Sequence, residues 1–199
     1  RAGAGKSSTA VTLNRLEGSG LLIRTRDGLM VTRPRELFER WLVGHLDHVM
    51  PRQVAGRFRT AETDPLKFEA LAEAVLSEYS EPPHVGLASS GAVAHSPMVF
   101  AWGGAAAAWR MLQYFRGVDT ILHVSHLPAN FASRLGLIPS RTGNLTIYEH
   151  GPAVNTIFHG TSPRAVHPML VYSDLIASGQ ERSTQTAEMI RKEFLREWS

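Results

Sequence analysis

Six polar side chains lie on the outer face of one short predicted helix near the start of the chain. They are Lys6, Ser7, Ser8, Thr12, Asn14 and Arg15. Ammonium and hydroxyl groups at a helix N-terminus bind phosphate, helped by the helix dipole. Asn forms two hydrogen bonds with adenine, and Arg forms two with guanine. These residue types in this order predict a helix that enters the major groove of double-stranded DNA.

The helix expected over residues 5–17 also has an apolar face, which a DNA-reading helix needs on its inner side. Ala10, Leu13 and Leu16 recur at three-residue spacing, with Thr9 beside them. Small and apolar residues at this spacing pack a helix onto a neighbouring one. The pattern therefore predicts that this helix packs on a preceding helix.

A β-hairpin is expected directly after this helix. Two apolar runs, residues 21–26 and 29–32, flank Asp27-Gly28. Asp-Gly between apolar runs is a strong hairpin signal because both residues tolerate positive φ. A short helix followed by a basic hairpin is the second half of a winged helix-turn-helix domain, so we expect Arg24, Arg26 and Arg33 to contact DNA from the wing.

A nucleotide-binding phosphate loop is the first alternative. Gly5-Lys6-Ser7 matches the end of such a loop, but the position of its first glycine falls before residue 1. The only later apolar run that ends in Asp is Met169–Asp174, and its neighbours favour a helix over a magnesium-binding strand. The sequence therefore disfavours a phosphate loop.

Catalytic and metal-binding patterns are weak throughout the chain. Two histidine pairs are spaced three apart, His45 with His48 and His123 with His126, without a third ligand at fixed spacing. No Gly-x-Ser-x-Gly nucleophile motif occurs, and there is no cysteine. Three carboxylates lie far apart in the sequence: Asp119, Glu149 and Asp174. We expect no catalysis, no cofactor and no metal.

The composition is that of a globular protein. The chain has 199 residues, of which 43% are hydrophobic and 20% are charged. No apolar run of 18 residues occurs, so no transmembrane helix is expected, and the sequence favours a cytoplasmic protein. The chain begins at Arg1 without a signal-peptide pattern, and we expect further residues upstream of it.

Charge is unevenly distributed along the chain. Residues 1–60 hold 11 basic and 5 acidic side chains, a net charge of +6. Residues 61–199 hold 10 basic and 13 acidic side chains, a net charge of −3. A basic first third on a mildly acidic remainder indicates that the first segment meets a polyanion.

The remaining pattern predicts an α+β (mixed α/β) fold. An amphipathic helix is expected over Arg35–His48, and Asp64 and Pro65 should open a helix that runs to about Tyr79. Later strands are expected over 84–88, 98–102, 120–124, 145–148 and 154–158. Later helices are expected over 103–114, 129–135, 167–178 and 181–198. The predicted domains are a partly truncated winged helix-turn-helix (1–50), a hinge-like linker (51–63) and a mixed α/β domain (64–199).

Several segments resemble a known family of regulators. Residues 2–17 and Gly20-Leu21-Leu22 resemble the recognition half of a bacterial winged helix. Residues 167–179 and the following Thr186-Ala187-Glu188 resemble the AbiEi-type antitoxins of type IV toxin–antitoxin systems. Residues 103–108 and 143–147 extend this resemblance over nearly the whole chain.

The resemblance implies a function as well as a fold. Such proteins repress their own operon at inverted repeats, which implies two copies on DNA, and their C-terminal domain is needed for antitoxin action. They oppose a nucleotidyltransferase-type toxin without forming a tight complex with it. The sequence departs from the family pattern in three ways. The first helices of the winged domain are absent or truncated, and Val11 stands where such helices often carry a polar side chain that contacts a base. Residues 81–97 form an extra segment.

Three other functions remain open on the residues alone. The C-terminal α/β domain could handle nucleotides as an enzyme, or bind a metabolite that changes DNA affinity. The chain could also be a protein–protein module with a basic face. Salt-sensitive, sequence-selective DNA binding separates the regulator from the last of these.

Overall fold

The computed structural model describes residues 5–80, 98–151, 158 and 160–198. The strand expected over 84–88 lies outside these residues, as does all of the strand expected over 154–158 except Phe158. None of the described helices combines the length and the apolar character that a membrane crossing requires.

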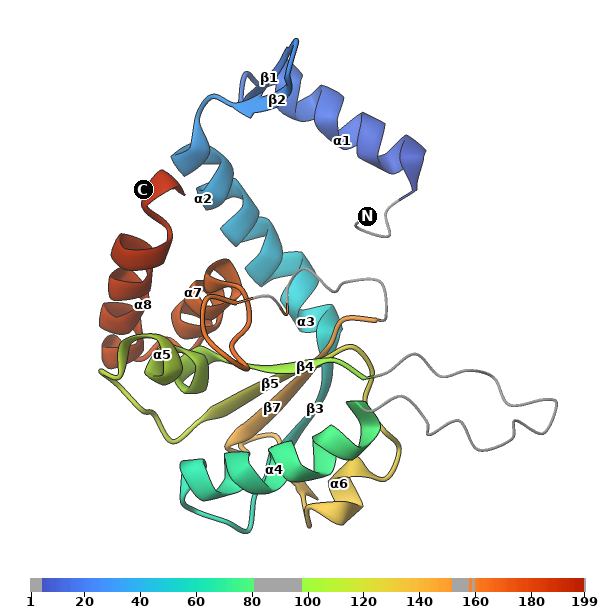
Figure 1. Cartoon of the computed structure of the whole chain (residues 1–199), viewed down its shortest axis with the longest axis vertical. Coiled ribbons are helices and arrows are strands. Elements are labelled where there is room, and N and C mark those ends of the chain that lie inside the picture. The colour runs from blue at the N-terminus through green and yellow to red at the C-terminus, as the bar shows by residue number, and fades with distance from the viewer. Residues whose placement is uncertain (1–4, 81–97, 152–157, 159, 199) are drawn as a thin grey trace, which may run out of the picture.

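The first part of the chain forms a helix, a hairpin and a second helix. Helix α1 spans Lys6–Gly18, and strands β1 (Leu22–Thr25) and β2 (Gly28–Val31) form an antiparallel hairpin, as predicted. Helix α2 spans Pro34–Gly44 and continues into the π-helical turn η1 (His45–Val49) and the short helix α3 (Met50–Gln53). Figure 1 shows α1 and the hairpin at one end of the molecule, with α2 leading from them to the central sheet.

The turn of the hairpin lies one residue earlier than expected. Thr25 pairs with Gly28, so Arg26 and Asp27 occupy the tip. Only Gly28 has a positive φ there, at 135°, whereas Asp27 does not need one. The threonine hydroxyl of Thr25 donates to the carbonyl of Gly28 at 3.1 Å, which closes the turn. Arg26 is therefore presented at the outermost point of the wing.

A five-stranded mixed sheet forms the centre of the molecule. Its order is β4-β5-β7-β3-β6, with β5 and β7 parallel and the other pairs antiparallel. The strands are β3 (Val54–Arg59), β4 (Phe100–Gly103), β5 (Thr120–Val124), β6 (Ile138–Pro139) and β7 (Leu145–Glu149). Together with the helices this sheet confirms the α+β fold class.

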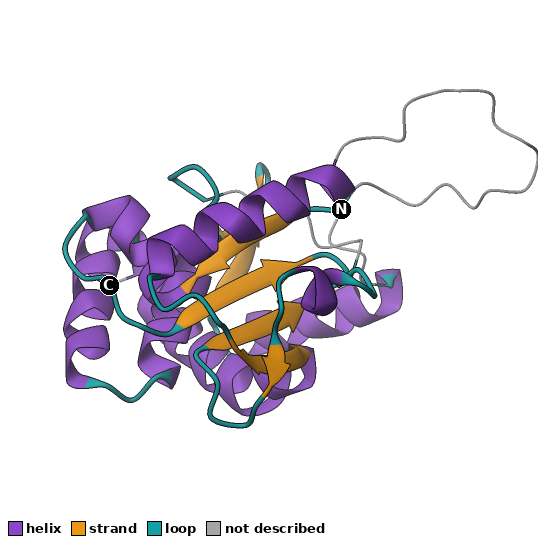
Figure 2. Ribbon diagram, turned by 90° about the horizontal axis from the view of Figure 1, so that it is seen from below, coloured by secondary structure: helices purple, strands orange, loops and turns teal. Residues whose placement is uncertain are grey.

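One face of the sheet is covered by α4 (Pro65–Ser80) and α6 (Phe131–Arg134). Figure 2 shows α4 lying along this face. Asp64 begins α4 as predicted, because its Oδ1 accepts a hydrogen bond from the N–H of Leu66 at 2.9 Å. Trp102, Leu122 and Ile147 are fully buried beneath these helices.

The other core joins the first part of the chain to the C-terminal helices. Helices α5 (Gly104–Leu112), α7 (Pro168–Ala177) and α8 (Glu181–Phe194), with the 3-10 turn η3 (Arg196–Trp198), enclose it. Phe38 of α2 lies in this core at 3% exposure, and its ring meets that of Tyr172 edge-on at 5.3 Å. Helix α2 is therefore fixed to the C-terminal helices by buried aromatic packing.

Residues 54–59, which lie in the expected hinge-like linker, form strand β3. Its neighbours are β7 on one side and β6 on the other, so it lies inside the sheet. Phe58 points into the core, while Arg57 and Arg59 on either side of it are exposed. This alternation is the two-residue period of a half-buried strand. The division of the chain into domains stays a prediction.

Candidate nucleic-acid interface

The outer face of α1 is available to a ligand along its whole length. No residue of α1 is buried, not even Ala10, Leu13 and Leu16 of the face predicted to pack on another helix, and no acidic side chain lies in its first turn. Lys6, Ser7 and Ser8 are exposed at its N-terminus, where the helix dipole favours an anion. Thr12 and Arg15 follow Ser8 at four- and three-residue spacing and are exposed on the same side.

Three cations of this region have no side-chain partner within the described residues. They are Lys6, Arg15 and the wing residue Arg26. Thr12, by contrast, donates its hydroxyl to the carbonyl of Ser8 at 3.0 Å, within the helix. The three cations lie at the start of α1, near its end and at the hairpin tip. They therefore mark the ends of a candidate DNA-binding surface formed by the outer face of α1 and the hairpin.

Arg24 joins the wing to α1. Its Nη2 donates to Oδ1 of Asn14 at 2.7 Å, and its Nε donates to Oε2 of Glu17 at 2.9 Å. The arginine and the glutamate are both well exposed, so this ion pair contributes at most about 1 kcal/mol. Asn14 and Arg24 are thus bonded to each other in the free protein, and DNA would have to displace this exposed contact to use either side chain.

Arg33 holds the end of α1. Its Nε donates to the carbonyl of Gly20 at 3.1 Å, and its Nη2 donates to the carbonyl of Ser19. Its Nη1 also forms an ion pair with Glu36 at 2.7 Å. Carbonyl groups at a helix C-terminus lack intrahelical partners, and a guanidinium satisfies them. The contacts of Arg33 therefore connect the segment after α1 to the first turn of α2.

Apart from the surface of α1 and the hairpin, a cluster of hydrogen-bonded polar side chains lies where α5, α7 and the sheet meet. Nε2 of His123 donates to Oδ2 of Asp174 at 2.9 Å, and the N–H of Gly104 donates to the same oxygen at 3.0 Å. Nδ1 of His123 lies 2.7 Å from Nε2 of His150. When Nε2 of His123 donates to the carboxylate, its Nδ1 accepts a hydrogen bond from the N–H at Nε2 of His150. We call His123, His150 and Asp174 the buried histidine–aspartate group.

Burial shifts the pKa of His150 and of two residues near the group, His45 and Tyr148. His123 is 2% exposed and Asp174 is 1% exposed. The ring of His123 stacks on that of Tyr148 at 5.2 Å and on that of His150 at 4.9 Å. Burial lowers the pKa of His150 to about 3, and the charges of His123 and His45 act in the same direction. Burial also lowers the pKa of His45 and raises that of Tyr148 to about 12.

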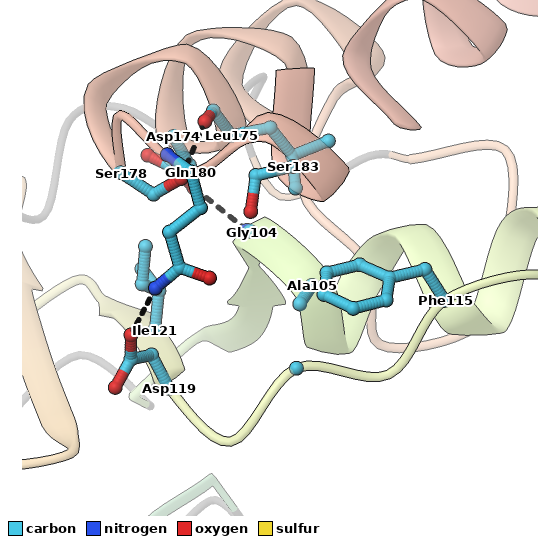
Figure 3. Close-up of a pocket in the computed structure, with 11 residues that line it drawn as sticks. Gly104, Ala105, Phe115, Asp119, Ile121, Asp174, Leu175, Ser178, Gln180 and Ser183 are labelled. Carbon is cyan, nitrogen blue, oxygen red and sulfur yellow. Dashed lines mark hydrogen bonds between the residues drawn. The ribbon is translucent and has the colours of Figure 1, made fainter. Parts of the chain in front are cut away.

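A small cavity lies beside Asp174 (Figure 3). Gln180 crosses it by donating to Oδ2 of Asp119 at 3.2 Å, and Ser183 also lines it. Its volume is about 30 Å³, which is room for one or two water molecules and much less than a metabolite site occupies. This cavity does not favour the ligand-sensing interpretation.

His48 and His126, the second members of the two spaced histidine pairs, form neither a hydrogen bond nor a ring contact with this group in the described part of the chain. His126 bonds to the neighbouring Ser125 at 3.2 Å, and His48 is exposed whereas His45 is buried. Across residues 5–80, 98–151, 158 and 160–198, no set of three or more His, Asp or Glu side chains is arranged to hold a metal ion. Met169–Asp174 lies in α7, so the run is helical, as its neighbours predict.

Sequence reasoning missed the buried histidine–aspartate group, because its members come from three elements far apart in the chain. Two local signals could have found part of it. Asp174 lies in the middle of an otherwise apolar helix, where a carboxylate is costly unless it is hydrogen-bonded. Gly103-Gly104 directly follows a strand, where a missing side chain leaves room for a neighbour.

We expect acid to destabilise the protein through His150. Its pKa is lowered in the folded state, so the unfolded chain binds a proton that the folded chain does not, and stability falls from about pH 6.5 towards pH 3. The loss per pH unit is at most about 1.4 kcal/mol for one proton. Urea unfolding at several pH values measures it. The variant His150→Asn should reduce the change of unfolding free energy with pH, whereas His48→Gln, at an exposed site, should leave it as in the wild type. An equal pH dependence of the wild type and both variants would contradict the role of His150.

Comparison with protein-family models places the chain among known proteins. A family described as "Transcriptional regulator, AbiEi antitoxin, Type IV TA system" matches residues 30–196, which is more than half of the chain. Comparison with curated proteins and with solved structures finds no match. The matched range covers α2 and the C-terminal elements but begins after α1, so the role of α1 rests on its own geometry.

Proposed function

The chain belongs to the AbiEi antitoxin family of type IV toxin–antitoxin systems, a family of transcriptional regulators, and we propose that it binds operator DNA and represses its own operon. The observation that carries the proposal is the exposed outer face of α1. It presents a helix N-terminus whose first turn has no acidic residue, and the surface carries three cations without a side-chain partner among the described residues: Lys6 at that end, Arg15 in the last turn and Arg26 at the hairpin tip.

In the proposed complex α1 lies in the major groove and the hairpin lies on the adjoining backbone. Lys6, Ser7, Ser8 and Arg26 contact phosphates and set the position of the protein. Arg15 and Thr12 reach base edges, because they lie on the outer face of the helix. Arg24 can exchange its exposed partners Asn14 and Glu17 for a phosphate at low cost, which frees Asn14 for a base. Arg33 acts by connecting the segment after α1 to α2.

Two copies bind an inverted repeat, since a symmetric site matches a pair of identical recognition helices. The protein opposes a nucleotidyltransferase-type toxin without a tight complex, and it acts as a regulator rather than as an enzyme. A repressor must be in the same compartment as its operator DNA, so the proposal includes a cytoplasmic location. Residues 1–50 act as the DNA-binding part.

Replacing Arg15 by Ala is expected to reduce discrimination between operator and scrambled DNA by about 1–3 kcal/mol, because a bidentate contact to a base is lost. Fluorescence anisotropy with both duplexes measures it. Arg182→Ala is the matched control, since Arg182 is exposed on α8 and also has no side-chain partner among the described residues. Equal losses on both duplexes would make Arg15 a phosphate contact instead.

The antitoxin role has a separate test. Co-expression of the chain with a cognate nucleotidyltransferase-type toxin should restore growth. The rescue should persist in the Arg15→Ala variant, because the proposal assigns DNA reading and antitoxin action to different parts of the chain. Co-purification under the same conditions should recover no stable complex. Failure of the wild-type chain to restore growth contradicts this role and leaves the repressor role intact.

A further inference from the structure

A second group of arginines without a side-chain partner among the described residues lies on the sheet, apart from α1. Arg57 on β3 and Arg141 after β6 line an open surface hollow, together with Pro139 and Ser140. The N–H of Ser140 donates to the carbonyl of Arg57 at 3.0 Å, so the two lining segments are joined by their backbones. The lining includes no acidic side chain.

The turn that carries Arg141 is held firmly against β3. Oδ1 of Asn144 accepts from the N–H of Thr60 at 3.0 Å, and its Nδ2 donates to the hydroxyl of Thr60 at 2.8 Å. A Cβ atom at Gly143 would lie 2.1 Å from the carbonyl oxygen of Phe58, so only glycine permits this close approach. The backbones at both ends of the hollow are therefore fixed before any ligand arrives, which lowers the entropy cost of binding.

The arginines of the hollow differ from most others in the chain. Several arginines of the helices packed on the sheet form ion pairs with glutamate, among them Arg110, Arg116 and Arg134. Arg57, Arg59 and Arg141 have no ion pair or side-chain hydrogen bond with any described residue, and all three are exposed. The hydroxyl of Ser140 also has no described partner. Unpaired guanidinium groups beside a hydroxyl are the donors that phosphate groups accept from.

We propose that the hollow between Arg57 and Arg141 binds phosphate groups of a nucleic-acid backbone, as a contact separate from α1. A polymer fits better than a single nucleotide because the hollow is open and its cations continue along the chain. Arg59 follows Arg57 on the same side of β3, about 6.8 Å further on, and exposed Arg52 precedes the strand. The basic excess of residues 1–60 is thereby divided between two surfaces. The inference does not depend on α1 reading an operator.

The test is direct binding of short oligonucleotides of mixed sequence to the full chain at several salt concentrations. Fluorescence anisotropy with duplex DNA and with single-stranded RNA distinguishes the two sources of phosphate. The double variant Arg57→Gln with Arg141→Gln should lower the slope of log affinity against log salt by about two, because about one unit is lost per phosphate contact. A change with only one of the two probes assigns the hollow to that nucleic acid.

The control carries the same change of charge elsewhere. Arg182→Gln with Lys192→Gln removes two exposed charges from α8 and should keep the wild-type slope within a few tenths of a unit. The pair of variants is repeated in a background with Lys6, Arg15 and Arg26 changed to Gln, which separates the hollow from α1. If the hollow variant and the control have the same slope with both probes, in both backgrounds, the proposal is wrong, whatever the outcome at α1. Circular dichroism checks that each variant is folded.

Discussion

Replacing Phe38 by Ala is expected to lower the free energy of unfolding by about 3–5 kcal/mol, because a fully buried ring leaves a cavity. The ring meets Tyr172 at 5.3 Å and Trp41 at 5.8 Å, inside the core that α2 shares with α7 and α8. For a chain of this size the loss corresponds to a fall of roughly 10 °C in Tm. Calorimetry or thermal circular dichroism measures it.

The control for this change is Val43→Ala on the same helix. Val43 is 60% exposed, so its removal should alter stability by less than about 0.5 kcal/mol. Equal Tm values for Phe38→Ala and Val43→Ala would mean that α2 is not fixed to the C-terminal helices. In that case α1 and the hairpin would not be held at a defined position by the rest of the chain.

Replacing Gly103 by Ala is expected to cost about 2–4 kcal/mol, since the added methyl group overlaps the buried histidine–aspartate group. A Cβ atom there would lie 2.2 Å from Oδ2 of Asp174 and 2.5 Å from Nε2 of His123. Neither side chain can withdraw, because both are almost completely buried. Urea unfolding should show the loss, and the NMR signal of the proton on His123 Nε2 should disappear or shift.

A second glycine provides the matched control for that change. Gly44 ends α2, and a Cβ atom at this position would meet nothing within 4 Å. Gly44→Ala should therefore leave stability unchanged or raise it by about 0.5–1 kcal/mol, as alanine favours a helix. If both alanine variants are equally stable, the close packing of Gly103 against Asp174 is wrong.

Local signals in the sequence predict most of the helices and the hairpin. Asp64-Pro65 marks the start of α4, and Asp27-Gly28 marks the hairpin, because each signal acts over a few residues of backbone. The strands expected over 120–124 and 145–148 are also found by their short apolar runs, and the second strand ends one residue later, at Glu149. These elements depend little on distant contacts, which is why single-sequence reasoning identifies them.

Local sequence signals do not predict strand β3. Val54–Arg59 has two arginines and a glycine, a composition that suggests a connecting segment. Its pairing with β7 and β6, together with burial of Phe58, makes it a strand. Pairing with distant strands makes this segment a strand, and local residue propensities carry no information about that pairing.

The candidate surface is predictable in its position but not in its internal contacts. The spacing of polar residues places Ser8, Thr12 and Arg15 on one face of α1, and the structure has them there. No spacing rule states that Arg24 bonds to Asn14 or that Arg33 holds the end of α1, since these pairs join residues 10 to 14 positions apart. Which cations stay unpaired is a property of the fold.

The most direct test of the central proposal is binding of the chain to the DNA upstream of its own operon. Affinity is measured at several salt concentrations against a scrambled duplex, for the wild type and for the variant with Lys6, Arg15 and Arg26 changed to Gln. We predict selective binding that weakens with salt, and a variant that loses both the selectivity and about three units of the salt slope. Unselective binding, or a variant that binds as the wild type does, would contradict DNA reading by α1.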